Sequence, residues 1–350
     1  MRVAREEIKE RACSRLQLPP PLDMVSSIHH NEAQNAMTTI VTVAYEGDRL
    51  ALLLQAKSLN LHAGSAGIVE IIVVENPSPG VRLAWRPELL AAYGHLAPIV
   101  RFVSSSDVAV LPKTGGWWTQ QVLKLEIARF VRTPDYLLLD AKHHLVKPLL
   151  PSFIRNDAGQ LRLRGASYVG HPLYPLLQTA FEHFGLPEAA VDFFPTTTPP
   201  FPLVRSVALE IKAYAEQHGA TTLGEFMVEN QLTEFFLYSA YLLASKRLEQ
   251  IYELHQIPYP VVWKGKSDRQ SCEELVVTSK LSESPFFGVH RRAVGDMDAE
   301  AMTVLASYWW ECRLMPSTKA GLVHLRAMLR EQRDPPFIRL KRRIARSFKR

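Results

Sequence analysis

The sequence predicts an α/β protein with a mostly parallel central sheet and flanking helices. Strand-like and helix-like patterns alternate along the first half of the chain, which is the pattern of βαβ units. Thr38–Ala44 and Ile68–Glu75 are rich in β-branched residues, and a helical pattern from about Asp48 to His62 lies between them. With 350 residues, the chain is also long enough to bury a large core.

The alternation continues to one particularly informative segment. A short strand is expected at Ile99–Val103, and apolar residues then recur at helical spacing from Trp118 to Val131. Pro134 stops that helix, and Tyr136–Leu139 is an apolar run short enough to be a buried strand. This strand ends in Asp140.

Beyond residue 150 the rhythm changes to a helical and loop-rich half. Phe193–Pro202 holds four prolines in ten residues and is predicted to lack regular structure. The other elements expected here are a hairpin or loop at Arg155–Ser167, helices at about Ser206–His218 and Glu229–Ser245, and a strand at Pro285–His290.

Composition and motifs exclude several classes of protein. Neither a GxxxxGK phosphate loop nor a GxGxxG dinucleotide fingerprint is present, which argues against a dehydrogenase. Three cysteines without paired spacing indicate neither a disulfide framework nor a cysteine zinc site. The sequence shows no apolar run long enough to span a bilayer and no signal core, so a cytoplasmic location is predicted.

The net charge of +6 comes from the C-terminal tail, since 337–350 carries seven lysines and arginines and no acidic residue. A nucleic-acid-binding face on the rest of the chain is therefore not indicated. Apolar residues at helical spacing make the tail a cationic amphipathic helix suited to an anionic membrane surface, namely Phe337, Leu340, Ile344 and Phe348. A disordered tail, or one that docks on a partner protein, is the alternative.

Polar side chains follow Asp140 at the strand end. In open α/β sheets, ligands bind outside the carboxyl ends of the strands, so Asp140 followed by Lys142 is a candidate site. The alternative is a solvated carboxylate in a loop. His143 and His144 are adjacent, so their side chains diverge in an extended segment and do not face one ion together.

Seven segments in order resemble the bacterial GT-A glycosyltransferases that were once grouped as domains of unknown function. They are TTIVTVAYEGDRLALLLQAKSL, EIIVVENPSP, GWWTQQVLKLEIARF, YLLLDAKHHLVKPLL, TPPFPLVRSVALEIK, ENQLTEFFLYSAYLL and SPFFGVHRRA, between Thr38 and Val294. The resemblance implies a GT-A-like, Rossmann-like fold. It also implies transfer of a sugar from a nucleotide-diphosphate sugar to a glycan or lipid-linked acceptor in polysaccharide biosynthesis. A non-catalytic relative that binds nucleotide sugars is the alternative.

The resemblance gives the strand end a role. Such enzymes carry Asp-x-Asp there, for the ribose and a divalent metal, Mn²⁺ or Mg²⁺, on the diphosphate. Here the triplet is Asp140-Ala141-Lys142, which lacks the second carboxylate. We therefore predict that Lys142 neutralises the diphosphate and that metal dependence is weak or absent. If a metal binds, Asp140 and His290 are its candidate ligands.

The remaining roles follow from helical spacing read with the resemblance. Trp117, Gln121 and Lys124 share a helix face toward a cleft or solvent, and Gln231, Glu234, Tyr238 and Tyr241 form a stripe on a later helix. Glu234 is the candidate general base, and catalytic roles are predicted for Glu234 and Asp140. Tyr238 and Tyr241 are predicted to bind the acceptor. The predicted donor-binding residues are Asp48, Gln121, Lys124, Asp140, Lys142, His290 and Arg291.

Four regions are predicted along the chain. They are an N-terminal accessory arm at 1–37, the GT-A-like domain at 38–294, a C-terminal helical extension at 295–336 and the basic amphipathic tail at 337–350.

Overall fold

The computed structural model describes residues 37–78, 81, 83–112, 116–187 and 191–332. Except for its last residue, the predicted N-terminal arm lies outside these residues. The predicted basic tail at 337–350 lies entirely outside them.

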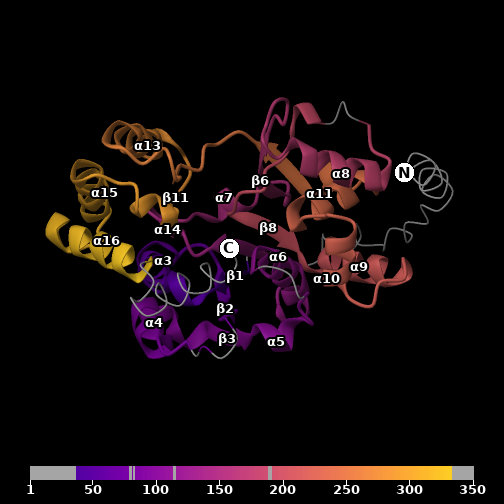
Figure 1. The fold of residues 1–350 in the computed structure, drawn as a ribbon, viewed down its shortest axis with the longest axis horizontal. Coiled ribbons are helices and arrows are strands. Elements are labelled where there is room, and N and C mark those ends of the chain that lie inside the picture. The colour runs from indigo at the N-terminus through magenta and orange to yellow at the C-terminus, as the bar shows by residue number, and fades with distance from the viewer. Residues whose placement is uncertain (1–36, 79–80, 82, 113–115, 188–190, 333–350) are drawn as a thin grey trace, which may run out of the picture.

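A five-stranded sheet with the order β3-β2-β1-β4-β8 forms the centre of the fold (Figure 1). Its strands are β1 (Thr38–Ala44), β2 (Ile68–Glu75), β3 (Val100–Ser104), β4 (Asp135–Asp140) and β8 (Phe201–Val204). The first four are parallel, and β8 pairs antiparallel with β4. The predicted α/β class with a mostly parallel sheet is confirmed, and β1 and β2 have the predicted bounds.

The sheet register brings three strand ends to one edge. Strand β1 lies between β2 and β4, and Val43 is opposite both Val74 of β2 and Asp140 of β4. The chain leaves β1 toward β2 on one side and reaches β4 on the other, so the strand order reverses beside Asp140. Ligands of open α/β sheets bind at such a switch point.

Helices on the first half of the chain pack around this sheet. Helix α3 (Arg49–His62) contacts α4 (Arg86–Tyr93), and α6 (Gly116–Glu126) contacts β1. Helix α6 continues as the 3-10 segment η3 (Ile127–Phe130), so the helix predicted up to Val131 is present in two parts. The other short elements here are η1 (Glu46–Asp48), η2 (Gly94–Ile99) and α5 (Ser105–Val108).

Strand β8 corrects the prediction that Phe193–Pro202 lacks regular structure. Phe201 and Pro202 pair with Leu138 and Leu137 of β4. A proline is tolerated in this position because β8 ends the sheet, and an edge strand does not need every backbone N–H. Tyrosine hydroxyls occupy its outer side: the Val204 N–H donates to Tyr238 Oη at 2.9 Å, and Tyr252 Oη donates to the Pro202 carbonyl at 2.8 Å.

The helix predicted at Glu229–Ser245 is interrupted. Helix α10 (Leu223–Glu229) ends where the prediction begins, and α11 (Glu234–Ala244) starts five residues later. Between them Gln231 has a φ of +53°, which no α-helix accommodates. The break matters because it makes Glu234 the first residue of α11.

Two small sheets complete the second half. One has the order β10-β11-β5, and the other β7-β6-β9. Their strands are β5 (His143–Leu145), β6 (Leu161–Ala166), β7 (Phe194–Pro195), β9 (Tyr252–His255), β10 (Val261–Val262) and β11 (Phe286–Val289). The accompanying helices are α7 (Pro151–Ile154), α8 (Tyr174–Phe184), α9 (Arg205–Gln217), α12 (Leu248–Ile251) and α14 (Arg291–Val294).

Three further helices lie on the left in Figure 1, where the last of them contacts α3. They are α13 (Arg269–Leu281), α15 (Ala299–Glu311) and α16 (Thr318–Gln332). The side chain of Asp298 caps α15, accepting from the Ala301 N–H at 2.7 Å. An ion pair at 2.8 Å joins Glu331 of α16 to Arg49 of α3. No helix among the described residues is long and apolar enough to cross a bilayer.

Candidate functional site

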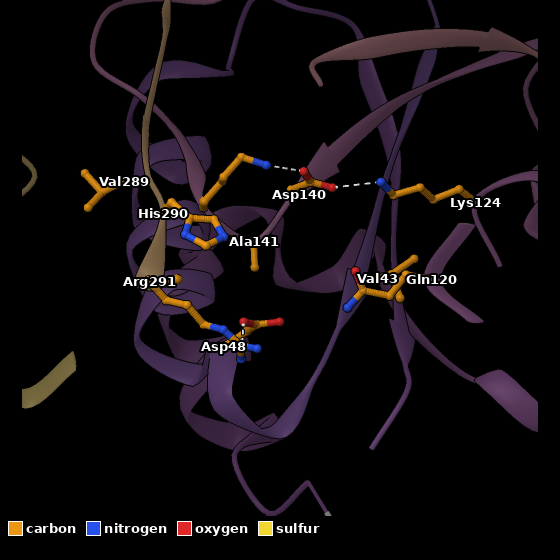
Figure 2. A pocket seen from close by; sticks show the side chains of 11 residues that line it. Val43, Asp48, Gln120, Lys124, Asp140, Ala141, Val289, His290 and Arg291 are labelled. Atoms are coloured by element: carbon orange, nitrogen blue, oxygen red, sulfur yellow. Dashed lines mark hydrogen bonds and ion pairs between the residues drawn. The ribbon is translucent and has the colours of Figure 1, made fainter. Parts of the chain in front are cut away.

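Two lysines converge on Asp140 at the carboxyl end of β4. Lys124 Nζ, from α6, lies 3.1 Å from Asp140 Oδ1, and Lys142 Nζ pairs with Oδ2. Figure 2 shows the Lys124 ammonium group pointing toward this carboxylate. Both lysine side chains are largely buried, whereas Asp140 keeps 26% of its side-chain surface exposed. The predicted strand-end position therefore holds a compact cluster of two ammonium groups around one carboxylate.

Lys124 also connects this cluster to Glu234. Its Nζ lies 3.1 Å from Glu234 Oε1, and the ammonium sits 5.0 Å from the ring centroid of Phe235. Gln121, one turn before Lys124, accepts a hydrogen bond from the Glu234 backbone N–H at 3.3 Å. The start of α11 is therefore fixed against α6, and one ammonium group serves two carboxylates.

The charges of this cluster support one another. Burial opposes charge on Asp140, but Lys124 and Lys142 outweigh burial and hold its pKa well below the ordinary value. Burial likewise opposes the Lys124 charge, yet Asp140 and Glu234 raise its pKa. For Glu234, burial prevails over the attraction of Lys124, so its pKa is raised. Asp140 is thus a permanent carboxylate, whereas Glu234 is closer to accepting a proton.

A pocket of about 140 Å³ opens between β1, β4 and β11. Arg291 Nη1 lies 3.4 Å from Asp48 Oδ1 on its wall (Figure 2), and the Arg291 guanidinium is 5.1 Å from the ring centroid of Tyr45. Gly47 permits this approach, because a Cβ there would lie 2.8 Å from Arg291 Nη1. Burial raises the pKa of Asp48 to about 6, although Arg291 opposes the rise.

A second pocket of about 490 Å³ adjoins the first one. Both pockets are lined by Gln120, Lys124, Asp140, Lys142 and His290. The remaining lining of the second pocket is Trp117, Gln121, His171, Leu173, Leu176, Thr197, Thr198, Pro199, Thr233, Glu234, Phe236 and Trp263. The shared residues make the two pockets one continuous site with the Asp140 cluster at its centre.

Trp263 contacts two of the residues that both pockets share. Its ring lies 5.2 Å from the Lys142 ammonium and 5.2 Å from the His290 ring. Burial, together with the charges of Lys142, Arg292 and Arg291, lowers the pKa of His290 to about 4, so its imidazole is neutral near pH 7. Strand β11 brings His290 here through Gly288, where a Cβ would lie only 2.9 Å from Val261 Cγ2.

These side chains fit an anion better than a divalent cation. Each oxygen of Asp140 already contacts an ammonium group, and a cation bound there would meet the charges of Lys124 and Lys142. No cluster of three or more histidine, cysteine, aspartate or glutamate side chains with metal-ligand geometry occurs in the described part of the chain. The donor set at Asp140 therefore does not match the all-oxygen ligand sets that Mg²⁺ and Mn²⁺ prefer.

The predicted donor residues are brought together by the fold. Asp48, Lys124, Asp140, Lys142, His290 and Arg291 line the smaller pocket, and Gln121 lines the larger one. Glu234 lies in the larger pocket beside Lys124. Asp48 precedes α3, but its side chain accepts from the Tyr45 N–H at 3.2 Å rather than capping that helix. The roles of these residues stay predictions.

Tyr238 and Tyr241 require a correction, since neither lines the two pockets. Both rings are buried in the core, and the whole of Glu234–Leu242 is buried, so α11 has no solvent-facing stripe. Tyr241 Oη donates to Glu210 Oε2 at 3.3 Å. Both hydroxyls thus serve internal contacts.

The adjacent histidines diverge as predicted, and neither lines the pockets. His143 Nδ1 accepts from the Asp140 N–H at 3.3 Å, while His144 Nε2 accepts from Trp309 Nε1 at 2.9 Å. Burial lowers the pKa of His143 and brings that of His144 down to about 3. Both imidazoles support the architecture as neutral groups.

Several lining residues were not found from the sequence. Trp263, His171 and Thr197–Thr198 come from segments without helical or strand periodicity. Gln120 lines both pockets and lies on the predicted helix, but it was not among the predicted site residues. The signal available for Trp263 was a large aromatic residue in a polar, glycine-containing stretch, WKGKSD.

Comparison with known proteins identifies a family for this chain. Residues 49–265 match the family described as "Family of unknown function (DUF6492)". The chain belongs to this family. The match covers the Asp140 cluster, Glu234 and Trp263, and it ends before His290. No curated protein matches the chain.

Solved structures that are similar to this chain include glycosyltransferases. An active-site mutant of LgtC is 15% identical, with a TM-score of 0.37, and covers 56% of this chain and 70% of its own. The galactosyltransferase LgtC in complex with donor and acceptor sugar analogs is 11% identical (TM-score 0.42; 72% and 87% covered). The bifunctional glycosyltransferase WbbM is 10% identical (TM-score 0.44; 72% and 45% covered).

Proposed function

We propose that this protein is a glycosyltransferase that uses a nucleoside-diphosphate sugar as donor. The observation that carries the proposal is the convergence of Lys124 and Lys142 on Asp140 at the switch point of the sheet, with Arg291 on the same pocket wall. A diphosphate needs cationic donors, and a sugar or ribose hydroxyl needs an acceptor such as Asp140. Few other ligand classes need both within one site.

The smaller pocket suits the nucleoside diphosphate. Lys142 and Arg291 line this pocket and would bind phosphate oxygens, and the neutral His290 would add a hydrogen-bonding ring without further charge. Charge develops on the diphosphate as its bond to the sugar breaks, so preorganised cations here lower the barrier. Asp48 is available to a ribose or base hydrogen-bond donor.

Glu234 is the proposed general base. It lines the larger pocket, and burial raises its pKa toward the range in which a carboxylate accepts a proton during the reaction. Lys124 keeps it ionised until an acceptor hydroxyl arrives within hydrogen-bond distance. Proton transfer from that hydroxyl to Glu234 would accompany attack of the oxygen on the anomeric carbon and departure of the diphosphate.

The proposal requires no divalent metal. Lys142 and Lys124 supply positive charge beside the only carboxylate at the end of β4, which supports neutralisation of the diphosphate by side chains. The acceptor is a glycan or a lipid-linked glycan.

The test uses the full chain and a set of UDP-, GDP- and dTDP-sugars, with CMP-sugars as monophosphate comparisons. Binding is followed by thermal shift, and turnover by release of the nucleoside diphosphate. Asp140→Asn is expected to lower turnover at least about tenfold, or 1.4 kcal/mol. Asp296→Asn, an exposed aspartate outside both pockets, is the matched control.

The outcomes separate the enzyme from its non-catalytic alternative. Binding of a diphosphate sugar without turnover, with or without acceptor, would identify a nucleotide-sugar-binding relative. If no diphosphate sugar shifts the melting temperature, or if Asp140→Asn has wild-type turnover, the proposed site is wrong.

A further inference from the structure

The larger pocket contains features that binding of a diphosphate does not explain. Among the residues that line it alone there is no lysine or arginine, and Glu234 is the one carboxylate. Its walls combine indole rings, threonine hydroxyls and an amide. We infer that this pocket binds an oligosaccharide, with Trp117 and Trp263 as the surfaces on which sugar rings stack. The inference rests on the proposed function and specifies its acceptor.

The two tryptophans are unusual in their exposure. Trp117 is 55% exposed and Trp263 is 42% exposed, and of the three tryptophans exposed in the described part of the chain these two line one pocket. Large apolar side chains are normally buried, so an open ring on a pocket wall indicates a ligand with a matching apolar face. Sugar rings provide such a face through their C–H groups, and they carry hydroxyls around the rim.

The polar groups of the pocket match those hydroxyls. The larger pocket is lined by Thr197, Thr198 and His171. A threonine hydroxyl and a neutral imidazole can each donate one hydrogen bond and accept another. Gln121 Nε2 and Thr233 Oγ1 are buried and have no partner within the part of the chain that the structure describes. Buried polar groups are normally hydrogen-bonded, so unused ones beside a cavity favour a ligand rich in hydroxyl groups.

The lining also distinguishes among ligand classes. An anionic acceptor would find no lysine or arginine in this pocket beyond the shared Asp140 cluster. An alkyl chain would bury the threonine hydroxyls and the Gln121 amide without hydrogen bonds, which costs free energy. A neutral polyol satisfies both the aromatic and the polar walls. This chemistry selects the glycan portion of an acceptor over its lipid.

The distance of Trp117 from Lys124 along α6 indicates more than one sugar unit. Trp117 and Lys124 are seven residues apart on α6, a rise of about 10 Å along the helix axis. Trp263 stands at the Lys142 end, beside the cluster where a donor sugar would react. The acceptor sugar that receives the new bond would therefore stack near Trp263, and the preceding unit near Trp117.

The experiment measures binding of maltotetraose, cellotetraose and chitotetraose to the full chain by equilibrium dialysis, with tryptophan fluorescence as a second readout. At least one tetrasaccharide is expected to bind. Trp117→Ala should weaken that binding at least about tenfold, since the stacking surface is lost. Trp117→Phe should restore part of the affinity. Trp310→Ala is the matched control, because Trp310 is 54% exposed but lies outside both pockets.

Nucleotide binding separates this inference from the proposed function. Trp117 does not line the smaller pocket, so Trp117→Ala should bind a nucleoside diphosphate with wild-type affinity. Saccharide binding that depends on Trp117, in a protein without nucleotide-sugar turnover, would keep the inference and reject the proposed function. The inference is overturned if none of the three tetrasaccharides binds, if Trp117→Ala and Trp310→Ala behave alike, or if decanoate binds more tightly than every saccharide.

Discussion

The smaller and the larger pocket meet at the same carboxylate but use different chemistry. The smaller one places Asp48 and Arg291 against each other just beyond the ends of β1 and β11, whereas the larger one is formed by loops and helix ends that carry tryptophans and threonines. Fixed charges suit a ligand group that is constant, such as a diphosphate. Rings and hydroxyls suit a ligand whose hydroxyl pattern differs from one acceptor to another.

Lys124 is the boundary between the two pockets, so its removal is the strongest way to break this comparison. Lys124→Met leaves the Asp140 and Glu234 carboxylates without their shared cation, and we expect a loss of about 3 to 5 kcal/mol of unfolding free energy. Denaturant titration measures this loss. The double variant Lys124→Met, Glu234→Gln should recover part of it.

The control for this prediction is Lys280→Met. Lys280 pairs with Glu311 at 2.6 Å, but both side chains are about half exposed. Exposed pairs contribute less than about 1 kcal/mol, so this variant should be nearly neutral. Equal losses of unfolding free energy for the two lysine variants would show that the buried pair contributes no more to stability than the exposed pair.

A pH titration sharpens the comparison on the side of the smaller pocket. The pKa of Asp48 is raised by burial from 3.8 to about 6, so between these values the folded protein binds more protons than the unfolded chain. Stability that Asp48 supports at low pH is therefore lost as pH rises through 6. Asp48→Asn removes this dependence, and its stability relative to wild type should rise by about 2 to 3 kcal/mol from pH 4 to pH 7.5.

Thermal unfolding of both proteins across this pH range tests the sign of the effect. Burial would not be the dominant influence on Asp48 if the relative stability of Asp48→Asn fell with rising pH. A constant difference would mean that Arg291 fully balances the burial cost.

Tyr238→Phe tests the second half of the molecule. The Val204 N–H would lose its acceptor, which costs about 1 kcal/mol of unfolding free energy. Nucleotide and saccharide affinity should stay at wild-type values, because Tyr238 lines neither pocket. A tenfold loss of saccharide affinity at unchanged stability would restore the tyrosine to the acceptor site.

The smallest expected effect is that of a chelator. Excess EDTA should leave nucleotide-sugar turnover and affinity unchanged, since Lys124 and Lys142 contact both carboxylate oxygens of Asp140. Loss of turnover with EDTA, restored by Mn²⁺, would contradict this prediction and require ligands other than the Asp140 cluster alone.

The sequence predicts the central sheet better than the walls of the larger pocket, for a physical reason. Strands β1 and β2 are apolar and β-branched because they are buried on both faces, so composition alone marks their bounds. The positions of Asp140 and Lys142 could be predicted in the same way, because both lie at the carboxyl end of the apolar strand β4. Helix α6 has a regular period, which placed Gln121 and Lys124 on one face.

The structure of the helical and loop-rich half is harder to predict from the sequence, because contacts between residues distant in sequence determine which side chains are buried. Tyr238 is buried because α11 packs against α6, α8 and α9, and the break at Gln231 has no proline or glycine to mark it. A helix buried all round has no polar stripe, so spacing alone assigned Tyr238 and Tyr241 to a face that does not exist. Trp263 reaches the site through a loop, where no periodicity reveals direction.

The two tyrosine hydroxyls on β8 have a consequence for the protein in a crowded solution. An edge strand with unpaired backbone groups is a template on which another chain can add a strand and begin an aggregate. Tyr238 and Tyr252 already occupy the Val204 N–H and the Pro202 carbonyl, and Pro202 has no N–H to offer. Tyrosine hydroxyls therefore occupy the backbone groups that another strand would need, and self-association through β8 is blocked.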